Sequence, residues 1–337
     1  MSGPARLEVE LDREGRHFGE LYVPWSRDAS AYGRLSVPVV VVRGGAGPTL
    51  LVSAGIHGDE YEGQLALRRL AQQIDPKTLS GRLIFVPTAN PPASVAARRT
   101  SPVDGENLAR IFPGKPDGSL SQQLAEGLTR LLLPLSDALL DLHSGGSTLE
   151  YLPCAFGRLP SDPALARRCL AMIMAFGAPE AMLMRSPEAS GTFVSTALAQ
   201  GLPAMASELG GGGTVLPQTL DLAKKGVLNV AAHMGILPQP GPAAKSRLLG
   251  ISGAHFLRAP QSGLFEPAVS LGQTVHEGEV AGWLWQAERP ELAPEPLHFG
   301  ADGIVVCRRV PVTCEKSDVL FHLAEPITEA ELIPLAS

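Results

Sequence analysis

A histidine and a glutamate three residues apart are the first feature of the chain that suggests metal chemistry. His57 and Glu60 lie in the segment GIHGDE, directly after an apolar run that predicts a buried strand. Zn²⁺ prefers imidazole nitrogens and carboxylate oxygens as ligands, and a catalytic zinc keeps one coordination position open for water. The spacing allows both side chains to reach one ion across a turn between a strand and a helix. The same short pattern also occurs in ordinary loops with solvated charges.

A second histidine stands at the end of another apolar run. His143 follows the segment 139–142 and is followed, after one serine, by the pair Gly145-Gly146, which leaves space beside an imidazole ring. Ligands of open α/β sheets bind beyond the carboxyl ends of the strands, so His143 is a candidate for the same site. The alternative is a core histidine bonded to a backbone carbonyl. Asp141 should share the strand face of His143 and is a candidate for orienting a ligand histidine; a helix cap or a buried salt bridge is the alternative.

A glutamate at the end of a third apolar segment suits the hydrolysis of an amide bond. Glu208 follows Ala206 and Ser207, and the glycine run 210–213 comes soon after it. Zinc hydrolases need a base for the attacking water and an acid for the leaving amine, and one carboxylate can serve as both in turn. The alternative is a glycine-rich turn that carries an incidental surface glutamate.

Arginines gather in the segment 98–114, which contains Arg98, Arg99 and Arg110. Guanidinium groups bind carboxylates with two parallel hydrogen bonds, and they stabilise the oxyanion of a tetrahedral intermediate. These arginines are therefore candidates for holding a substrate or polarising its carbonyl group. A solvated basic loop is the alternative.

Strands and helices alternate between residues 45 and 235, and they would position these side chains. The predicted strands are Thr49–Ile56, Arg82–Pro87, Asp137–Leu142 and Pro203–Glu208, and the predicted helices are Tyr61–Ile74, Ser121–Leu133 and Ala164–Phe176. This alternation predicts an α/β sandwich with a largely parallel central sheet.

Three regions follow from the pattern along the chain. Residues 1–44 read as an N-terminal β segment, and residues 45–240 as the domain that holds the candidate catalytic residues. A proline-rich stretch, 238–242, predicts a linker. Short strands and turns beyond it predict a small all-β module over residues 245–326.

Composition excludes several classes of function. The chain has 337 residues and a net charge of −6, which is not basic enough for a nucleic-acid partner. No apolar run approaches the ~18 residues of a membrane span, and the first residues lack the apolar core of a signal peptide. The four cysteines form no C-x-x-C pair. We therefore expect a cytoplasmic protein with reduced thiols that acts on a small molecule, without membrane contact. A homo-oligomer is compatible with the sequence.

The order of the four signals resembles the succinylglutamate desuccinylase/aspartoacylase family, over about residues 45–325. The resemblance implies a zinc-carboxypeptidase-like fold: a three-layer α/β sandwich with a mixed, largely parallel sheet, and a barrel-like β module at the C-terminal end. It also implies one Zn²⁺ held by His57, Glu60 and His143. By the same resemblance Glu208 is the general base and Arg99 polarises the substrate carbonyl.

The arginine segment departs from the family at one position. The family usually has Asn-Arg at the end of its carboxylate-binding segment, where this chain has Ala109-Arg110. The resemblance assigns carboxylate binding to Arg110, with help from Asn107. Other stretches are similar to the branch of the family that deacetylates N-acetyl-2,4-diaminobutyrate.

The expected function is therefore zinc-dependent hydrolysis of a small N-acyl amino acid, and N-acetyl-2,4-diaminobutyrate is the first candidate. Glu150 could meet a side-chain amine at the far end of the pocket, or it could be a solvated loop residue. A metallocarboxypeptidase acting on peptides and a non-catalytic binding protein on the same fold are the alternatives.

Overall fold

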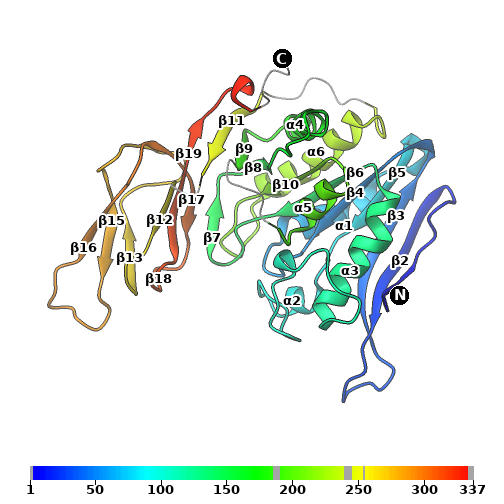
Figure 1. The fold of residues 1–337 in the computed structure, drawn as a ribbon, viewed down its shortest axis with the longest axis horizontal. Helices are drawn as coiled ribbons and strands as arrows, with labels where there is room; N and C mark the ends of the chain where they lie inside the picture. Colours follow the sequence, from blue (N-terminus) through cyan, green and yellow to red (C-terminus); the bar gives the residue numbers. More distant parts are fainter. Residues whose placement is uncertain (1–2, 185–189, 239–244, 253–254, 333–337) are drawn as a thin grey trace.

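A large mixed β-sheet crosses the molecule and carries helices on both faces (Figure 1). The computed structural model describes residues 3–184, 190–238, 245–252 and 255–332. The helices in these ranges are α1 (Glu62–Gln73), α2 (Pro91–Val95), α3 (Leu120–Leu132), α4 (Pro163–Phe176), α5 (Phe193–Ala199) and α6 (Pro217–His233). The strands of the first 240 residues are β1 (Arg6–Glu8), β2 (Gly15–Pro24), β3 (Arg34–Arg43), β4 (Gly45–Ala54), β5 (Ser80–Val86), β6 (Ala138–His143), β7 (Leu149–Tyr151), β8 (Cys154–Gly157), β9 (Glu180–Met184) and β10 (Ala204–Glu208).

The centre of the sheet is parallel. Strands β5, β4, β6 and β10 lie side by side in that order and run in the same direction. The β1–β2–β3 ribbon continues one edge in antiparallel pairing. On the other side β8 pairs antiparallel with β10, and β9 and then β11 (Arg247–Ile251) follow parallel to β8. The predicted fold class, a sandwich with a mixed, largely parallel sheet, is therefore confirmed.

Alternate residues of the central strands enter two separate cores. Leu50 and Val52 of β4 pack in the core beneath α1, α4 and α6, whereas Leu51 packs in the core beneath α3 and α5. Because the central strands are covered on both faces, they are continuously apolar rather than alternating. This explains why their sequences were recognisable as buried strands.

Several helices begin and end where their flanking residues predict. Ser119 caps α3 by accepting a hydrogen bond from the backbone N–H of Gln122, and Asp162 caps α4 in the same way. Gly177 ends α4 in the left-handed conformation, with φ of 78°, which glycine adopts without steric cost. The observed bounds of α1, α3 and α4 differ from the predicted ones by at most one residue at each end.

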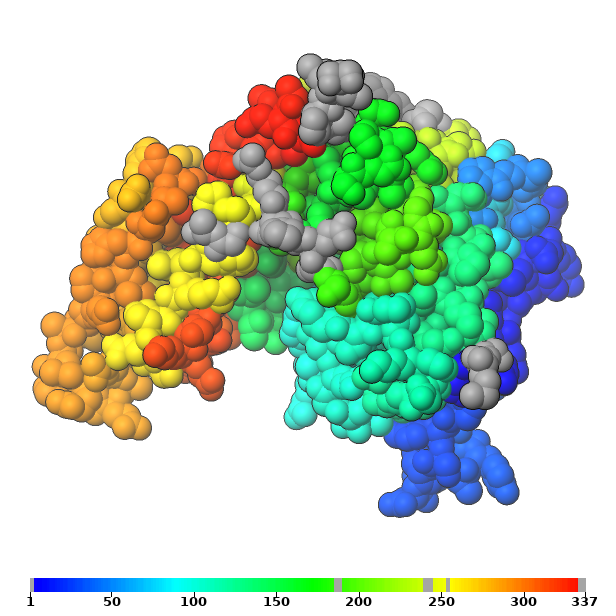
Figure 2. Space-filling model, viewed as in Figure 1, coloured from blue at the N-terminus to red at the C-terminus, as the bar shows by residue number. Residues whose placement is uncertain are grey.

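The C-terminal strands form a second body beside the sandwich (Figures 1 and 2). Besides β11, they are β12 (Phe256–Arg258), β13 (Gly263–Pro267), β14 (Thr274–Val275), β15 (Val280–Trp285), β16 (Glu295–His298), β17 (Gly303–Arg309), β18 (Thr313–Cys314) and β19 (Val319–Pro326). Strands β16, β15, β13 and β18 make a separate antiparallel sheet. Strands β19 and β17 continue the large sheet beyond β11, so the two bodies share backbone hydrogen bonds. The domain boundaries at 44, 240 and 245 stay a prediction.

The sequence patterns missed the strands β7, β8 and β9 and the helices α2, α5 and α6. Most of the predicted linker, 238–242, lies outside the described residues. None of the helices in the described ranges is long and apolar enough to cross a membrane.

Candidate metal centre and active site

Three adjacent strands bring the predicted catalytic residues to one edge of the sheet. The turn after β4 carries His57 and Glu60, and β6 and β10 end at His143 and Glu208. In the pairing of β10 with β6, Glu208 lies directly opposite His143. Because parallel strands present their carboxyl ends at the same edge, residues far apart in the sequence meet there.

Glu60 bridges the two histidines. One carboxylate oxygen of Glu60, Oε1, lies 2.6 Å from Nδ1 of His57, and the other, Oε2, lies 2.8 Å from Nδ1 of His143. Potential ligand atoms of the three residues all lie within 4.8 Å of one another. His57 and Glu60 are each only 3% exposed. Two nitrogens and a carboxylate that converge in this way match the donor set of a catalytic zinc site.

The second ring nitrogen of His143 supports the same interpretation. Nε2 of His143 lies 3.0 Å from Oδ2 of Asp141, and Oδ1 of Asp141 accepts a hydrogen bond from Ser53. A carboxylate oxygen behind the ring favours the proton on Nε2, which leaves a lone pair on Nδ1 facing Glu60. The residues present therefore fit a divalent cation. The prediction that Asp141 orients a ligand histidine agrees with these contacts.

The pKa values of the triad reflect its packed charges. Burial alone would raise the pKa of Glu60, but His57 and His143 together hold it below its ordinary value. Burial lowers the pKa of His57 in spite of the neighbouring Glu60. Burial would also lower the pKa of His143, but Asp141 and Glu60 raise it well above the ordinary value. These shifts favour an ionised Glu60 beside a neutral His57, which is the state that binds a metal ion, whereas His143 must release a proton when it binds one.

Arg99 points at the same centre. Its Nη1 lies 3.3 Å from Nδ1 of His57 and 3.6 Å from Oε1 of Glu60. The side chain is 44% exposed, and it lines the cavity described next. A guanidinium group in this place can reach the oxygen of a carbonyl group that binds beside the triad.

A cavity of about 550 Å³ opens over the triad. Its polar wall contains the three triad residues together with Arg99, Arg110 and Glu208, and its apolar wall includes Phe156, Met184, Phe193, Leu198 and Phe256. Phe256 belongs to β12, so the C-terminal body contributes to the wall of the cavity. The volume suits a small molecule.

Glu208 is a half-buried residue whose carboxyl group has unused hydrogen-bonding capacity. Burial, and then the charge of Glu60, raise its pKa to about 8. Its Oε2 is buried and has no hydrogen-bond partner among the described residues. A carboxyl group with a pKa near neutrality, beside a metal-type triad, is suited to accepting and returning a proton.

Comparisons with known proteins agree with this geometry. Residues 46–234 match the catalytic domain of the succinylglutamate desuccinylase/aspartoacylase family. The chain is also 39% identical, over 96% of each sequence, to the N-alpha-acetyl-L-2,4-diaminobutyric acid deacetylase of Halomonas elongata. The chain belongs to the succinylglutamate desuccinylase/aspartoacylase family.

Two solved structures share nearly the whole fold. A succinylglutamate desuccinylase from Silicibacter sp. TM1040 is 36% identical, with a TM-score of 0.93, over 97% of this chain and all of that one. The product-bound ectoine utilization protein EutE from Ruegeria pomeroyi is 36% identical, with a TM-score of 0.92, over 96% of this chain and 99% of that one. The protein is therefore a deacylase of this amidohydrolase family, and His57, Glu60 and His143 are its metal-binding triad.

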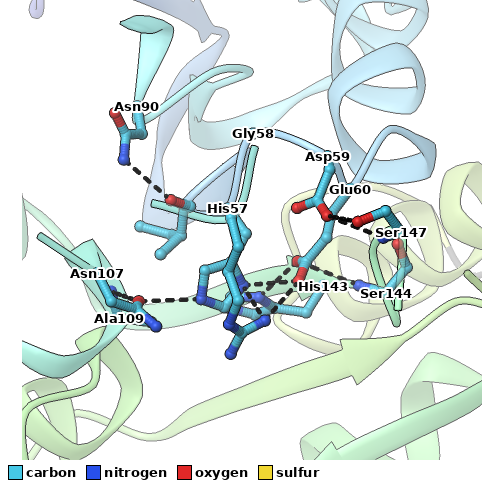
Figure 3. Close-up of polar contacts among 12 residues, drawn as sticks. His57, Gly58, Asp59, Glu60, Asn90, Asn107, Ala109, His143, Ser144 and Ser147 are labelled. Atoms are coloured by element: carbon cyan, nitrogen blue, oxygen red, sulfur yellow. Dashed lines mark hydrogen bonds and ion pairs between the residues drawn. The ribbon is translucent and has the colours of Figure 1, made fainter. Parts of the chain in front are cut away.

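The segment that is predicted to bind the substrate carboxylate lines the cavity only in part. Arg110 and Ala109 line the cavity, and Nη1 of Arg110 donates to the backbone oxygen of Ala109 at 2.8 Å. Burial and the nearby Arg99 lower the pKa of Arg110. Asn107, expected to help Arg110, is not among the described residues that line the cavity; its Oδ1 lies 3.2 Å from Nε2 of His57 instead (Figure 3). Its predicted role in substrate binding stays untested.

Glu150 also differs from its suggested role. Its carboxylate accepts hydrogen bonds from Arg308 of β17, from Nε at 2.8 Å and from Nη2 at 2.6 Å. Its neighbours Leu149 and Tyr151 line the cavity, but Glu150 is not among the described lining residues. The structure thus makes Glu150 a link between β7 and the C-terminal body, rather than a free carboxylate at the far end of the pocket.

Sequence reasoning missed the contacts that hold the two catalytic loops together. Oδ2 of Asp59 accepts hydrogen bonds from the backbone and hydroxyl of Ser147, each at 2.8 Å (Figure 3). Gly145 and Gly211 both lie so close to the backbone oxygen of Leu149 that an added Cβ would stand 2.1 Å from it. The motif GIHGDE and the glycine runs were the available signals, but their partners lie elsewhere in the sequence.

Proposed function

We propose that the protein is a zinc-dependent deacylase that hydrolyses the amide bond of a small N-acyl amino acid. The observation that carries the proposal is the placement of the His57–Glu60–His143 triad and Glu208 in one cavity. The products would be a carboxylate from the acyl group and a free amine.

Different residues of the cavity would perform different steps of this reaction. When bound, Zn²⁺ would act as a Lewis acid toward the substrate carbonyl and would lower the pKa of a water molecule. Glu208 accepts a proton from the attacking water and passes it to the departing amine nitrogen. Arg99 donates hydrogen bonds to the carbonyl oxygen as negative charge develops on it. Arg110 holds the carboxylate of the amino acid, which fixes the amide bond against the triad.

We propose N-acetyl-2,4-diaminobutyrate as the first substrate to test. The relative from Halomonas elongata bears the name of a deacetylase for this compound. Glu60, Asp141 and Glu208 are the carboxylates among the described residues that line the cavity, and each already has a role at the metal centre. A side-chain ammonium group would therefore meet polar lining residues such as Ser144 and Thr148, rather than a dedicated carboxylate.

A panel of N-acyl amino acids tests the proposal. Purified zinc-loaded protein is assayed for release of the free amine from N-acetyl-2,4-diaminobutyrate, N-acetylaspartate and N-succinylglutamate. A series of dipeptides is the comparison for the metallocarboxypeptidase alternative. Turnover of one N-acyl amino acid, with a kcat/KM well above those of all dipeptides, supports the proposal. Faster turnover of the dipeptides contradicts the proposal. A preference for N-acetylaspartate would reject N-acetyl-2,4-diaminobutyrate as the substrate but would leave the proposed deacylase activity intact.

A further inference from the structure

His57 makes a contact that determines which of its nitrogens can bind a metal ion. Nε2 of the ring lies 3.2 Å from Oδ1 of Asn107 (Figure 3). The same Oδ1 accepts a hydrogen bond from the backbone N–H of Ala109 at 3.0 Å. A backbone N–H can only donate, so this atom of Asn107 is its acceptor oxygen.

The proton of the His57 ring is therefore assigned by geometry. Because Oδ1 of Asn107 is an acceptor, Nε2 of His57 must donate to it. A neutral imidazole carries one N–H, so Nδ1 keeps its lone pair. Nδ1 is the atom that faces Oε1 of Glu60 at 2.6 Å. The contact with Asn107 thus turns the metal-binding nitrogen toward the site.

We infer that Asn107 is a positioning residue of the metal centre, which holds the His57 ring in the tautomer and orientation that bind the ion. The inference rests on the proposed metal chemistry of the triad and replaces the idea that Asn107 binds the substrate carboxylate.

The two ligand histidines have different hydrogen-bond partners on the side of the ring away from the metal site. The partner of His143 is the carboxylate of Asp141, at 3.0 Å, whereas the partner of His57 is the neutral amide of Asn107. A carboxylate behind an imidazole makes the ring a stronger electron donor to the metal. His57 is therefore the weaker donor of the pair, and a negative charge at position 107 should strengthen it.

Asn107 also connects the metal centre with the substrate segment. Its side chain caps the short 3₁₀ helix Leu108–Arg110, which carries Ala109 and Arg110 into the cavity wall. One amide oxygen thus bonds to both His57 and this segment. A change at Asn107 is expected to act first on metal binding, and on the carboxylate end of the cavity only through the cap.

Metal affinity measured on the full-length protein tests the inference independently of the substrate. The dissociation constant for Zn²⁺ is determined by competition with a chelating dye. Asn107→Ala should weaken zinc binding by roughly 10- to 100-fold, as is typical for loss of a partner behind a metal ligand. Asn107→Asp keeps an acceptor oxygen and adds charge, so it should bind zinc at least as tightly as wild type.

Asn90→Ala is the matched control. Asn90 is also a helix-capping asparagine, although it is more deeply buried than Asn107. Its Nδ2 donates to the backbone oxygen of Ile56, beside the ligand turn, at 3.3 Å. Among the described residues, none of the hydrogen bonds of Asn90 involves a side chain of the metal triad, so this variant should keep a zinc dissociation constant close to that of wild type. Equal weakening by Asn90→Ala and Asn107→Ala would overturn the inference, because loss of a cap would then explain both.

Kinetics at saturating zinc distinguish the two roles of Asn107. A positioning residue predicts that Asn107→Ala changes KM for the substrate much less than it changes zinc affinity. If Asn107→Ala leaves the dissociation constant for Zn²⁺ unchanged but strongly raises KM, Asn107 binds the substrate instead. If Asn107→Ala does not fold, weaker zinc binding by Asn107→Asp than by wild type would overturn the inference on its own. None of these zinc measurements depends on which substrate the enzyme hydrolyses.

Discussion

Glu208 lies directly opposite His143 where strand β10 pairs with β6. Cross-strand partners share a face of the sheet, so the candidate base and a metal ligand enter the cavity side by side. Backbone hydrogen bonds maintain this relationship beyond the strand ends, since Leu209 donates to the oxygen of His143 at 3.0 Å and Gly145 donates to that of Gly210 at 3.0 Å. The position of Glu208 relative to His143 is therefore determined by sheet register rather than by a flexible loop.

Removal of a triad residue should abolish tight metal binding. His57→Ala takes away one of three ligands, so we expect zinc well below one ion per chain by elemental analysis after dialysis. The exposed His276, which follows β14 in the C-terminal body and does not line the cavity, provides the control: His276→Ala should retain the zinc of the wild type. Equal, stoichiometric zinc in wild type and His57→Ala would contradict the ligand assignment.

Replacement of the base should separate metal binding from catalysis. Glu208→Gln keeps the shape of the side chain but cannot accept a proton, so turnover should fall by about 10²–10⁴, the usual contribution of a general base. Zinc content should remain that of the wild type, because Glu208 is not one of the three ligands. A near-normal rate in a variant that still holds zinc would rule out this role.

Arg110 should act through the carboxylate of the substrate. A hydrogen bond to a charged group contributes about 1.5–3 kcal/mol, so Arg110→Ala should raise KM for a free-carboxylate substrate by roughly 10- to 100-fold. The effect on the corresponding carboxamide should be small. Arg289→Ala, in an exposed loop of the C-terminal body, is the control and should leave both constants unchanged. Equal effects of Arg110→Ala on acid and amide would show that the carboxylate binds elsewhere.

His322 should make the folded protein sensitive to acid. Its ring is 2% exposed, stacks on Phe256 with ring centroids 3.7 Å apart, and has neither nitrogen hydrogen-bonded among the described residues. Burial, with a smaller effect of His255, lowers its pKa from 6.5 to about 3. Between these two values the unfolded chain binds a proton that the folded chain does not. The contribution of His322 to the free energy of unfolding is therefore complete above pH 6.5. It decreases by about 1.4 kcal/mol for each pH unit between pH 6.5 and pH 3.

Urea titrations at several pH values check this expectation. His322→Phe retains an aromatic ring against Phe256 but has no group to titrate, so its free energy of unfolding should decline less than that of wild type between pH 6.5 and pH 4. The exposed residue His298 provides the comparison, and His298→Phe should follow the wild-type curve. Parallel pH curves for wild type and His322→Phe would show that His322 is not buried in its neutral form.

Local sequence signals were sufficient to predict the strands that position the candidate catalytic residues. The apolar runs before His57, His143 and Glu208 predicted buried strands, because central strands covered on both faces must be apolar throughout. The end of each strand was marked by an ionisable residue close to glycines. These features are local, and they predicted the α/β sandwich and the candidate residues at the strand ends. The resemblance to the family then assigned the metal triad and the base.

Only the tertiary structure decided what the remaining polar side chains contact. Asn107 meets His57 across 50 residues and Glu150 meets Arg308 across 158, and no pattern within either segment encodes such a partner. The short strands β7 and β8 were missed for a similar reason, because each is stabilised by pairing with a distant strand, β17 or β10. Hydrogen-bond partners of this kind depend on sheet order and register, which arise from the packing of the whole chain and not from the local sequence.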